Sequence, residues 1–84
     1  MDETKHEIRQ FLSELLPPER LANLRDDTPL RTSGILDSME LLRLVGLVEE
    51  KFGIEVSAYE AGIENFDRID DIAAFIQRKQ TAKA

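Results

Sequence analysis

The sequence predicts an all-α protein, a four-helix bundle of three longer helices and one short third helix, with a long loop between helices 1 and 2. Apolar residues recur at helical spacing in three stretches, and capping residues or prolines mark the ends of those stretches. No segment alternates between apolar and polar residues for long enough to predict a strand. The 84 residues suit one domain, 1–84, and are too few for two.

The first predicted helix begins at Thr4, because Thr4 and Glu7 have the spacing of a capping box. Pro17-Pro18 ends it, since proline lacks an N–H and restricts the residue before it. Residues 17–36 are rich in turn formers and predict a long loop pinned to the core, with a short helical turn near Glu19–Asn23. The apolar stripe of the helix comprises Ile8, Phe11, Leu12, Leu15 and Leu16.

The second predicted helix has both of its ends marked by residues that favour those positions. Asp37 and Glu40 have capping-box spacing at the start. The helix runs to about Phe52 and ends at Gly53, a residue favoured just past a helix end. Its core stripe comprises Leu41, Leu44, Val45, Val48 and Phe52.

A short extended link, residues 54–56, follows the second helix. Ser57 and Glu60 have the spacing to cap a short third helix over Ala58–Ile63. Residues 65–67 read as a loop, because Asn and Asp favour turns. This part of the chain therefore holds the short helix of the predicted bundle.

The last predicted helix takes Asp67 or Asp70 as its cap and runs to about Arg78. We expect the core of the domain to span about 4–78 and residues 79–84 to form a frayed tail. The buried face of this helix comprises Ile69, Ile72, Ala73, Phe75 and Ile76.

The composition is acidic, with 11 Lys and Arg against 17 Asp and Glu and a net charge of −6. This charge disfavours nucleic acid and favours basic protein patches, or it serves solubility alone. The absence of cysteine excludes disulfides, thiolate metal sites and cysteine catalysis. The first residues lack a signal-peptide pattern and no apolar run reaches membrane-spanning length, so we expect a cytoplasmic monomer without membrane insertion.

The segment Gly34-Ile35-Leu36-Asp37-Ser38-Met39-Glu40 joins the long loop to the second helix. Ser38 falls in the first turn, where N–H groups and the helix dipole favour an anion such as a phosphodiester on its hydroxyl. The negative charge of Asp37 opposes a phosphate, but its carboxylate could orient the hydroxyl or bind a metal used by a modifying enzyme. The alternative is that Asp37-Ser38 is simply a helix cap.

These residues resemble the attachment motif of acyl and peptidyl carrier proteins, and the resemblance spans roughly residues 4–78. It implies that a phosphopantetheinyl transferase moves 4'-phosphopantetheine from coenzyme A onto Ser38. The arm would then carry an acyl or aminoacyl thioester to ligases, synthases or transferases. A carrier of this family has no catalytic activity and no metal of its own. Further matching segments are Glu49–Val56, Glu64–Phe66 and Ile72–Ile76.

The sequence departs from the fatty-acid carriers at two places. Met39-Glu40 stands where those carriers usually have Leu-Asp, and Ser57 stands where a proline is often found. The segment Gly34–Ser38 looks closer to that of carriers of secondary metabolism and of amino-acid carriers, including D-alanine carriers. Fatty acid, polyketide and nonribosomal peptide pathways stay open.

Two surfaces are candidates for contacts with partners and cargo. An apolar patch on the second helix, flanked by charge, is a candidate docking surface, or else Leu42 packs under the long loop and Met39 is incidental. Apolar residues around the third helix could line a shallow cargo recess, although Tyr59 could be half-buried packing. The docking residues are Met39, Glu40, Leu42, Arg43, Gly46, Glu49 and Glu50, and the recess residues are Val56, Tyr59, Ile63 and Phe66.

Two other functions compete with the carrier interpretation. A helical interaction module would bind a partner protein and hold no prosthetic group. A small hydrolase would use Ser38 as nucleophile, but the single histidine, His6, lies near the N-terminus and suggests no base for it. The acid pairs 26–27 and 70–71 favour loop solvation and capping over catalysis.

Overall fold

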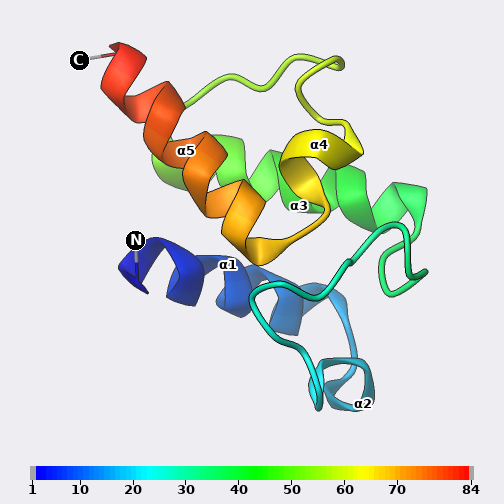
Figure 1. Ribbon diagram of the computed structural model, residues 1–84. Coiled ribbons are helices and arrows are strands. Elements are labelled where there is room, and N and C mark those ends of the chain that lie inside the picture. The colour runs from blue at the N-terminus through cyan, green and yellow to red at the C-terminus, as the bar shows by residue number, and fades with distance from the viewer. Residues whose placement is uncertain (1, 84) are drawn as a thin grey trace.

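The computed structural model describes residues 2–83, and it gives side-chain environments for residues 3–82. All regular structure in this range is helical, which confirms the all-α class. The five helices are shown in Figure 1 and are α1 (Asp2–Leu15), α2 (Pro18–Leu21), α3 (Ser38–Phe52), α4 (Ile63–Phe66) and α5 (Ile69–Lys83).

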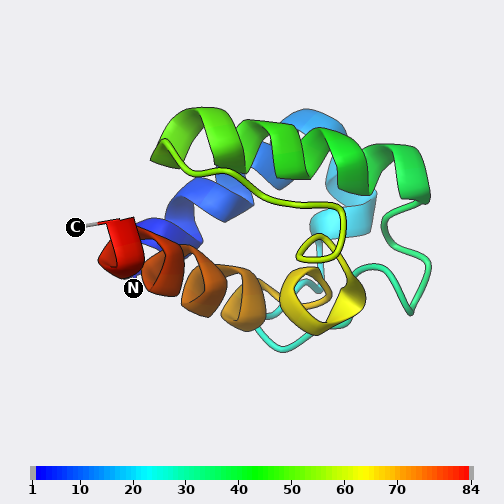
Figure 2. The ribbon, with the colours of Figure 1, turned by 90° about the horizontal axis from the view of Figure 1, so that it is seen from above.

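The three longer helices enclose the core, as the sequence predicts. α1 packs against both α3 and α5, and the short α4 packs against α5. Figure 2 shows α3 along one side of the molecule and α4 with α5 along the other. The buried apolar side chains come from all three long helices, from α4, from both loops that flank α3 and from the link after α1. They are Ile8, Phe11, Leu12, Leu16, Leu30, Leu36, Leu44, Val45, Val48, Ile54, Phe66, Ile69, Ile72, Ala73, Phe75 and Ile76.

Aromatic contacts join the helices at two places within this core. Phe11 of α1 and Phe52 of α3 meet edge to face, with ring centroids 6.5 Å apart. Phe66 of α4 and Phe75 of α5 lie 5.4 Å apart. Such pairs stabilise more than their buried area alone. Phe66 is fully buried, so α4 is held to α5 by a large apolar side chain despite its four residues.

The boundaries of α3 agree with the prediction because local hydrogen bonds set them. Asp37 Oδ1 accepts from the Glu40 N–H at 2.7 Å, and Glu40 Oε1 accepts from the Asp37 N–H at 2.9 Å. At the other end Gly53 has φ +63°, a left-handed conformation that glycine adopts without a Cβ penalty. Leu44, Val45 and Val48 are buried as expected, whereas the two outer members of the predicted stripe are only half-buried.

The first helix starts earlier than predicted, at Asp2 rather than at Thr4. Glu3 is an acidic residue in the first turn, where the positive end of the helix dipole favours it. The predicted end is right, since α1 stops at Leu15 before the two prolines. The predicted turn near Glu19–Asn23 exists as α2, which begins at Pro18, a favoured first helical residue.

The predicted short helix over Ala58–Ile63 is wrong in position. Ser57 and Glu60 do make the expected reciprocal hydrogen bonds, at 3.0 and 3.1 Å, but they close a turn and not a helix. Gly62 has extended backbone with φ −75° and ψ 175°, so the helix begins after it, at Ile63. The prediction of a loop at residues 65–67 is wrong for the same reason, because α4 includes Phe66.

The last helix differs from the prediction at both ends. Neither Asp67 nor Asp70 caps it, because α5 begins at Ile69 and the Ile72 N–H donates to the Arg68 carbonyl. The expected frayed tail is helical through Lys83, and Ala84 lies outside the described residues. The buried face of α5 is confirmed in full: Ile69, Ile72, Ala73, Phe75 and Ile76 are all buried.

The extension of α5 rests on contacts with the segment after α3. Lys79 Nζ lies 3.1 Å from both carboxylate oxygens of Glu60 and 5.8 Å from the ring centre of Phe75. The Ser57 N–H and the Lys79 ammonium together lower the pKa of the Glu60 carboxyl. These contacts hold the last turns of α5 where the sequence alone suggested a solvated tail.

Candidate functional site

Ser38 is the first residue of α3, and its side chain is exposed. Asp37 before it is the helix cap, with its carboxylate committed to the Glu40 N–H. Leu36, two residues upstream, is fully buried. The chain therefore emerges from the core at Leu36 and presents the next hydroxyl to solvent at a helix N-terminus, which favours a negative group.

The hydroxyl of Ser38 is held by Arg31, a residue that the sequence analysis missed. Arg31 Nη2 donates to Ser38 Oγ at 2.9 Å. Arg31 lies in the loop before α3 and Ser38 begins that helix. Their contact therefore depends on how the residues between them fold. In the sequence Arg31 is one basic residue in the long loop before Ser38. Basic residues in loops are too common to predict such a contact. A role for Asp37 in orienting Ser38 stays a prediction, since the structure shows Asp37 in its capping role.

A buried carboxylate fixes the loop that carries Arg31. Asp67 is 6% exposed, and its Oδ1 accepts from the backbone N–H groups of Arg31 at 2.8 Å and Thr32 at 3.0 Å. Its Oδ2 accepts from the Thr32 hydroxyl at 2.8 Å. The Asp67 carbonyl also accepts from the Leu30 N–H at 2.6 Å. Asp67, between α4 and α5, therefore anchors three consecutive loop residues.

These hydrogen bonds also decide the charge of Asp67. Burial by itself raises the pKa of a carboxyl group, since it disfavours the charged form. The donors from Thr32 and Arg31 outweigh that effect, with help from the nearby Arg68 charge, and lower the pKa of Asp67 below its usual range. The carboxylate is therefore an ionised acceptor at neutral pH, as a site that receives three hydrogen bonds requires.

The loop also folds back on itself just before α3. The Leu36 N–H donates to the Leu30 carbonyl at 2.8 Å, and both leucines are fully buried. Gly34 lies in this reversal with φ +86°, a conformation that L side chains rarely adopt. Arg20 of the segment after α1 donates to the Ile35 carbonyl at 3.2 Å. The prediction that apolar residues pin this loop to the core is confirmed.

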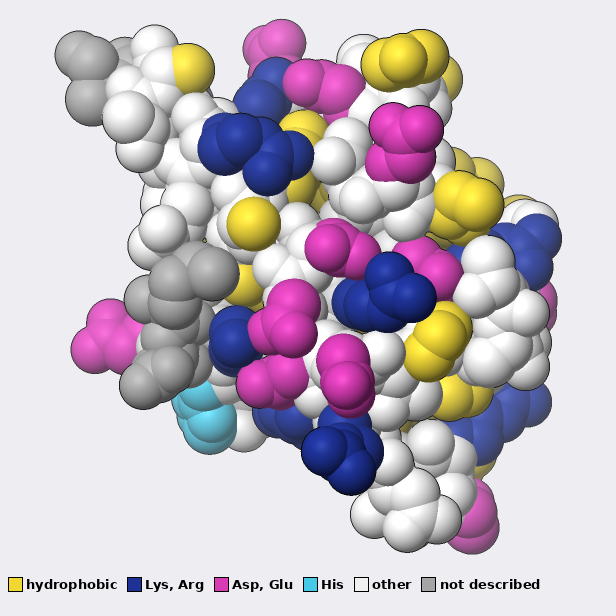
Figure 3. Space-filling model, in the orientation of Figure 1, with side chains coloured by type: hydrophobic (Ala, Val, Ile, Leu, Met, Phe, Trp, Pro, Cys, Tyr) yellow, Lys and Arg dark blue, Asp and Glu magenta, His cyan; other side chains and the backbone are white. Residues whose placement is uncertain are grey.

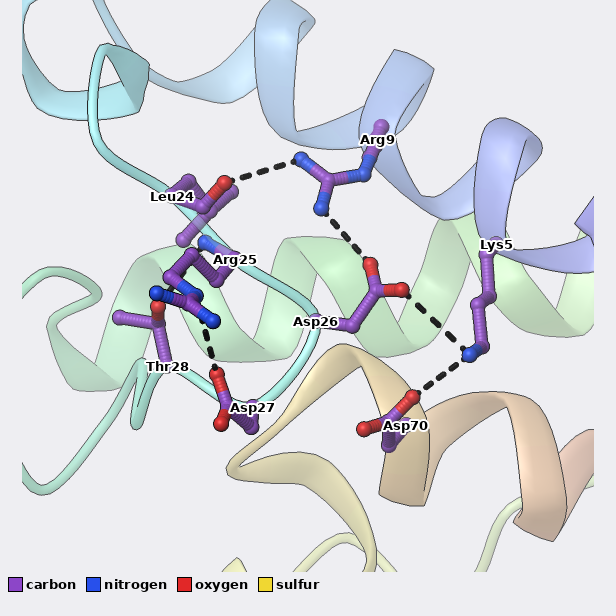
Figure 4. A network of polar contacts seen from close by, with 8 residues as sticks. All are labelled: Lys5, Arg9, Leu24, Arg25, Asp26, Asp27, Thr28 and Asp70. Atoms are coloured by element: carbon purple, nitrogen blue, oxygen red, sulfur yellow. Dashed lines mark hydrogen bonds and ion pairs between the residues drawn. The ribbon is translucent and has the colours of Figure 1, made fainter.

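A second polar network ties the start of the same loop to α1 and α5 (Figure 4). Asp26 lies between Arg9 Nη2 at 2.7 Å and Lys5 Nζ at 3.4 Å, and Lys5 reaches Asp70 at 2.7 Å. The hydrogen bond from Arg9 lowers the pKa of Asp26, and the bond to Asp70 raises the pKa of Lys5. The expectation of loop solvation and capping is thus wrong for Asp26 and Asp70, which form ion pairs with basic side chains of α1.

The predicted docking residues on α3 lie largely in solvent. Met39 is 65% exposed and Leu42 is 61% exposed, so the alternative that Leu42 packs under the loop is wrong. Arg43, Gly46 and Glu50 are exposed as well, and the space beside the Gly46 Cα is open. Docking of partners on this surface stays a prediction.

The two remaining acids of that set have partners within the chain. Glu40 completes the cap of α3 and lies 3.5 Å from Arg20. Glu49 Oε2 accepts from the Val56 N–H at 2.9 Å, and so it holds the segment that follows α3. Both side chains are half-buried. They therefore have structural roles in addition to any contribution to the charge of a docking surface.

The four predicted recess residues lie in different environments. Phe66 is fully buried against Phe75, Val56 is half-buried, Ile63 is 53% exposed and Tyr59 is 90% exposed. The alternative of half-buried packing for Tyr59 is therefore wrong. In Figure 3, several hydrophobic side chains lie at the upper right, over α4 and the segment before it. Val56 lines an open cavity together with Glu49 and Lys79. Most of the residues that line this cavity are polar.

Other kinds of site find no support in the described residues. His6 is exposed, as expected for a solvated histidine. Over the range that the structure describes, no group of three His, Asp or Glu side chains could hold a metal ion. None of the helices described is long and apolar enough to span a membrane.

Comparison with known proteins identifies the family of the chain. Residues 6–76 match the family model described as a phosphopantetheine attachment site. No curated protein gives a significant match to the chain. The exposed Ser38 hydroxyl, the helix N-terminus behind it and the cation beside it fit the linkage that such an arm requires. The chain therefore belongs to the phosphopantetheine attachment family, whose members are non-catalytic carriers that bind 4'-phosphopantetheine covalently and interact with transferases, ligases and synthases.

Proposed function

We propose that the chain carries an acyl or aminoacyl group as a thioester on a 4'-phosphopantetheine arm attached to Ser38. The observation that carries this proposal is the exposed Ser38 hydroxyl at the first position of α3, on a backbone fixed by the Asp37–Glu40 capping box. When attached, the arm supplies a thiol for the cargo. Delivery to partner enzymes then requires only that the cargo reach their active sites.

The surroundings of Ser38 support a carrier that is modified by another enzyme. During attachment the Ser38 oxygen would form a bond to phosphorus and the pyrophosphate linkage of coenzyme A would break. Adenosine 3',5'-bisphosphate would leave, and the hydroxyl proton would pass to a base. Arg31, which contacts this hydroxyl, is a cation and cannot accept that proton. Within the described residues Arg31 is the only side chain bonded to the Ser38 hydroxyl, so we assign the base to the transferase. The same argument disfavours a hydrolase that uses Ser38 as its nucleophile.

The exposed apolar residues of α3 support a docking surface beside the attachment point. Met39 and Leu42 lie within the first turns of the helix that begins at Ser38, and both are largely in solvent. Exposed apolar side chains flanked by charged ones are common at protein contacts. We therefore include Met39, Leu42 and Arg43 in the surface that transferases and cargo enzymes would contact.

The cargo class is proposed from the sequence alone. The segment Gly34–Ser38 resembles that of carriers for amino acids and secondary metabolites, so an aminoacyl or polyketide cargo fits better than an ordinary fatty acid. A cytoplasmic location and a monomeric state are part of the same proposal. Val56 and Ile63 would be the first recess residues to contact cargo, since Phe66 is sealed in the core.

Mass spectrometry of the intact chain tests the proposed function. The chain would be incubated with coenzyme A and a broad-specificity phosphopantetheinyl transferase. We expect the wild-type chain to gain the mass of one arm and Ser38→Ala to gain none. Ser33→Ala is the matched control, since Ser33 is an exposed serine of the loop before α3, and it should load like the wild type.

A folded, unmodified wild-type chain that gains no mass would contradict the proposal. The interaction-module alternative would then lead, because it expects partner binding without modification. Loading that persists in Ser38→Ala would keep the carrier function but overturn the assignment of Ser38.

A further inference from the structure

The guanidinium of Arg31 differs from those of most arginines in this chain. Arg9, Arg20, Arg25 and Arg68 each have a carboxylate oxygen at 2.7 to 3.7 Å. Within the described part of the chain, the only side chain bonded to the Arg31 guanidinium is the neutral hydroxyl of Ser38. A guanidinium has five N–H donors, so most of its donor capacity remains for an anion at that place.

Attachment of a phosphodiester would add a negative charge where acids are already close. Asp37 precedes Ser38 and Glu40 follows it in the first turn of α3, which would oppose a further negative charge. The helix dipole offsets part of that repulsion. Arg31 is the cation bonded to the linking oxygen itself, at 2.9 Å. The nonbridging oxygens of the new group would lie two bonds from this atom and within reach of the same guanidinium.

The position of Arg31 is set by the protein and not by the hydroxyl alone. Its backbone N–H donates to Asp67 at 2.8 Å, and Thr32 adds two more bonds to the same carboxylate. This buried anchor holds the backbone of Arg31 close to the start of α3 before any group is attached. Pre-positioned donors bind an anion with less loss of conformational freedom than mobile ones.

We propose that Arg31 binds the phosphodiester of the attached arm and so fixes the first atoms of the arm against the N-terminus of α3. This inference rests on the proposed function, since it needs an arm on Ser38. It assigns Arg31 a positioning role in the loaded protein. Asp67 acts through Arg31 by holding the loop.

Side-chain NMR of the unsubstituted protein tests this contact directly. The Nε–Hε resonances of Arg31 and Arg25 would be compared before and after loading, with each signal assigned from its lysine variant. We expect loading to shift the Arg31 resonance and to leave that of Arg25, an exposed arginine of the same loop, in place. An Arg31 resonance that loading leaves unchanged would overturn the inference.

Urea unfolding gives a second readout, which is independent of cargo transfer. The midpoint of the loaded form minus that of the unloaded form would be measured for wild type, Arg31→Gln and Arg25→Gln at low salt. We expect loading to lower the midpoint more in Arg31→Gln than in the other two, and added salt to reduce that difference. Equal changes in all three proteins would contradict the role of Arg31.

These outcomes separate the inference from the function on which it rests. A wild-type chain that never gains the arm contradicts both. A wild-type chain that gains the arm on Ser38 but shows neither the shift of Arg31 nor the different midpoint change supports the carrier function and overturns the inference.

Discussion

The two connections that flank α3 are built differently. The connection before it, residues 22–37, buries Leu30 and Leu36 completely and is held by the Asp67 carboxylate. The connection after it, residues 53–62, buries Ile54 but leaves Tyr59 90% exposed, and its polar contacts are at half-buried or exposed groups. The first connection ends directly before Ser38, the proposed attachment site. The difference shows that a buried carboxylate anchors the connection that leads to Ser38, whereas no such group anchors the described residues of the other connection.

The strongest test of this contrast removes one apolar side chain from each connection, the fully buried Leu36 and the half-buried Val56. Leu36→Ala should lower the free energy of unfolding by about 3 kcal/mol, because it leaves a cavity in the core. Val56→Ala should cost about 1 kcal/mol or less, since Val56 is only half-buried. Urea unfolding followed by circular dichroism measures both. Equal losses would show that the two connections are anchored to the same degree.

The polar anchor is the next target. Asp67→Asn keeps the shape of the side chain but removes its charge and places an N–H₂ group where one oxygen accepts hydrogen bonds. We expect a loss of about 2 kcal/mol, since the three part-buried donors of Arg31 and Thr32 would lose a charged acceptor. Glu60→Gln, in the other connection, is the matched control and should change the unfolding midpoint much less. An Asp67→Asn protein as stable as the wild type would contradict the anchoring role.

The contribution of the Asp67 carboxylate to stability should also depend on pH, with a smaller effect than the substitution. The folded-state pKa of Asp67 is lowered, so its contribution is fully present above the unfolded pKa of about 4 and is lost as pH falls through the lower folded value. Asp26 and Glu60 shift in the same direction. Urea midpoints between pH 6 and pH 3 should therefore fall less steeply in Asp67→Asn than in the wild type. Parallel slopes would indicate that Asp67 has no lowered pKa.

The comparison also separates what the sequence could predict from what it could not. The boundaries of α3 were predictable because the signals are local: Asp37 and Glu40 are three residues apart, and Gly53 ends the helix by its own backbone conformation. The buried face of α5 was predictable from helical spacing. In each case the residues that decide the structure are close in the chain.

The polar anchors of the first connection could not be predicted, because they join distant residues. Asp67 bonds to Arg31 and Thr32 across 36 and 35 positions, and as a sequence signal it looked like a helix cap. The position of α4 depends on the burial of Phe66 against Phe75, which outweighs the local capping signal at Ser57 and Glu60. Ser38 itself was predictable as a candidate, whereas its contact with Arg31 was not.

The number of reactive thiols in the chain tests the central claim most directly. The sequence contains no cysteine, so the unmodified chain has no thiol to react with a maleimide. After incubation with coenzyme A and the transferase, and after removal of free coenzyme A, a carrier should show one thiol per chain, and Ser38→Ala should show none. A wild-type chain that stays without a thiol, while a known carrier loads under the same conditions, would contradict the account.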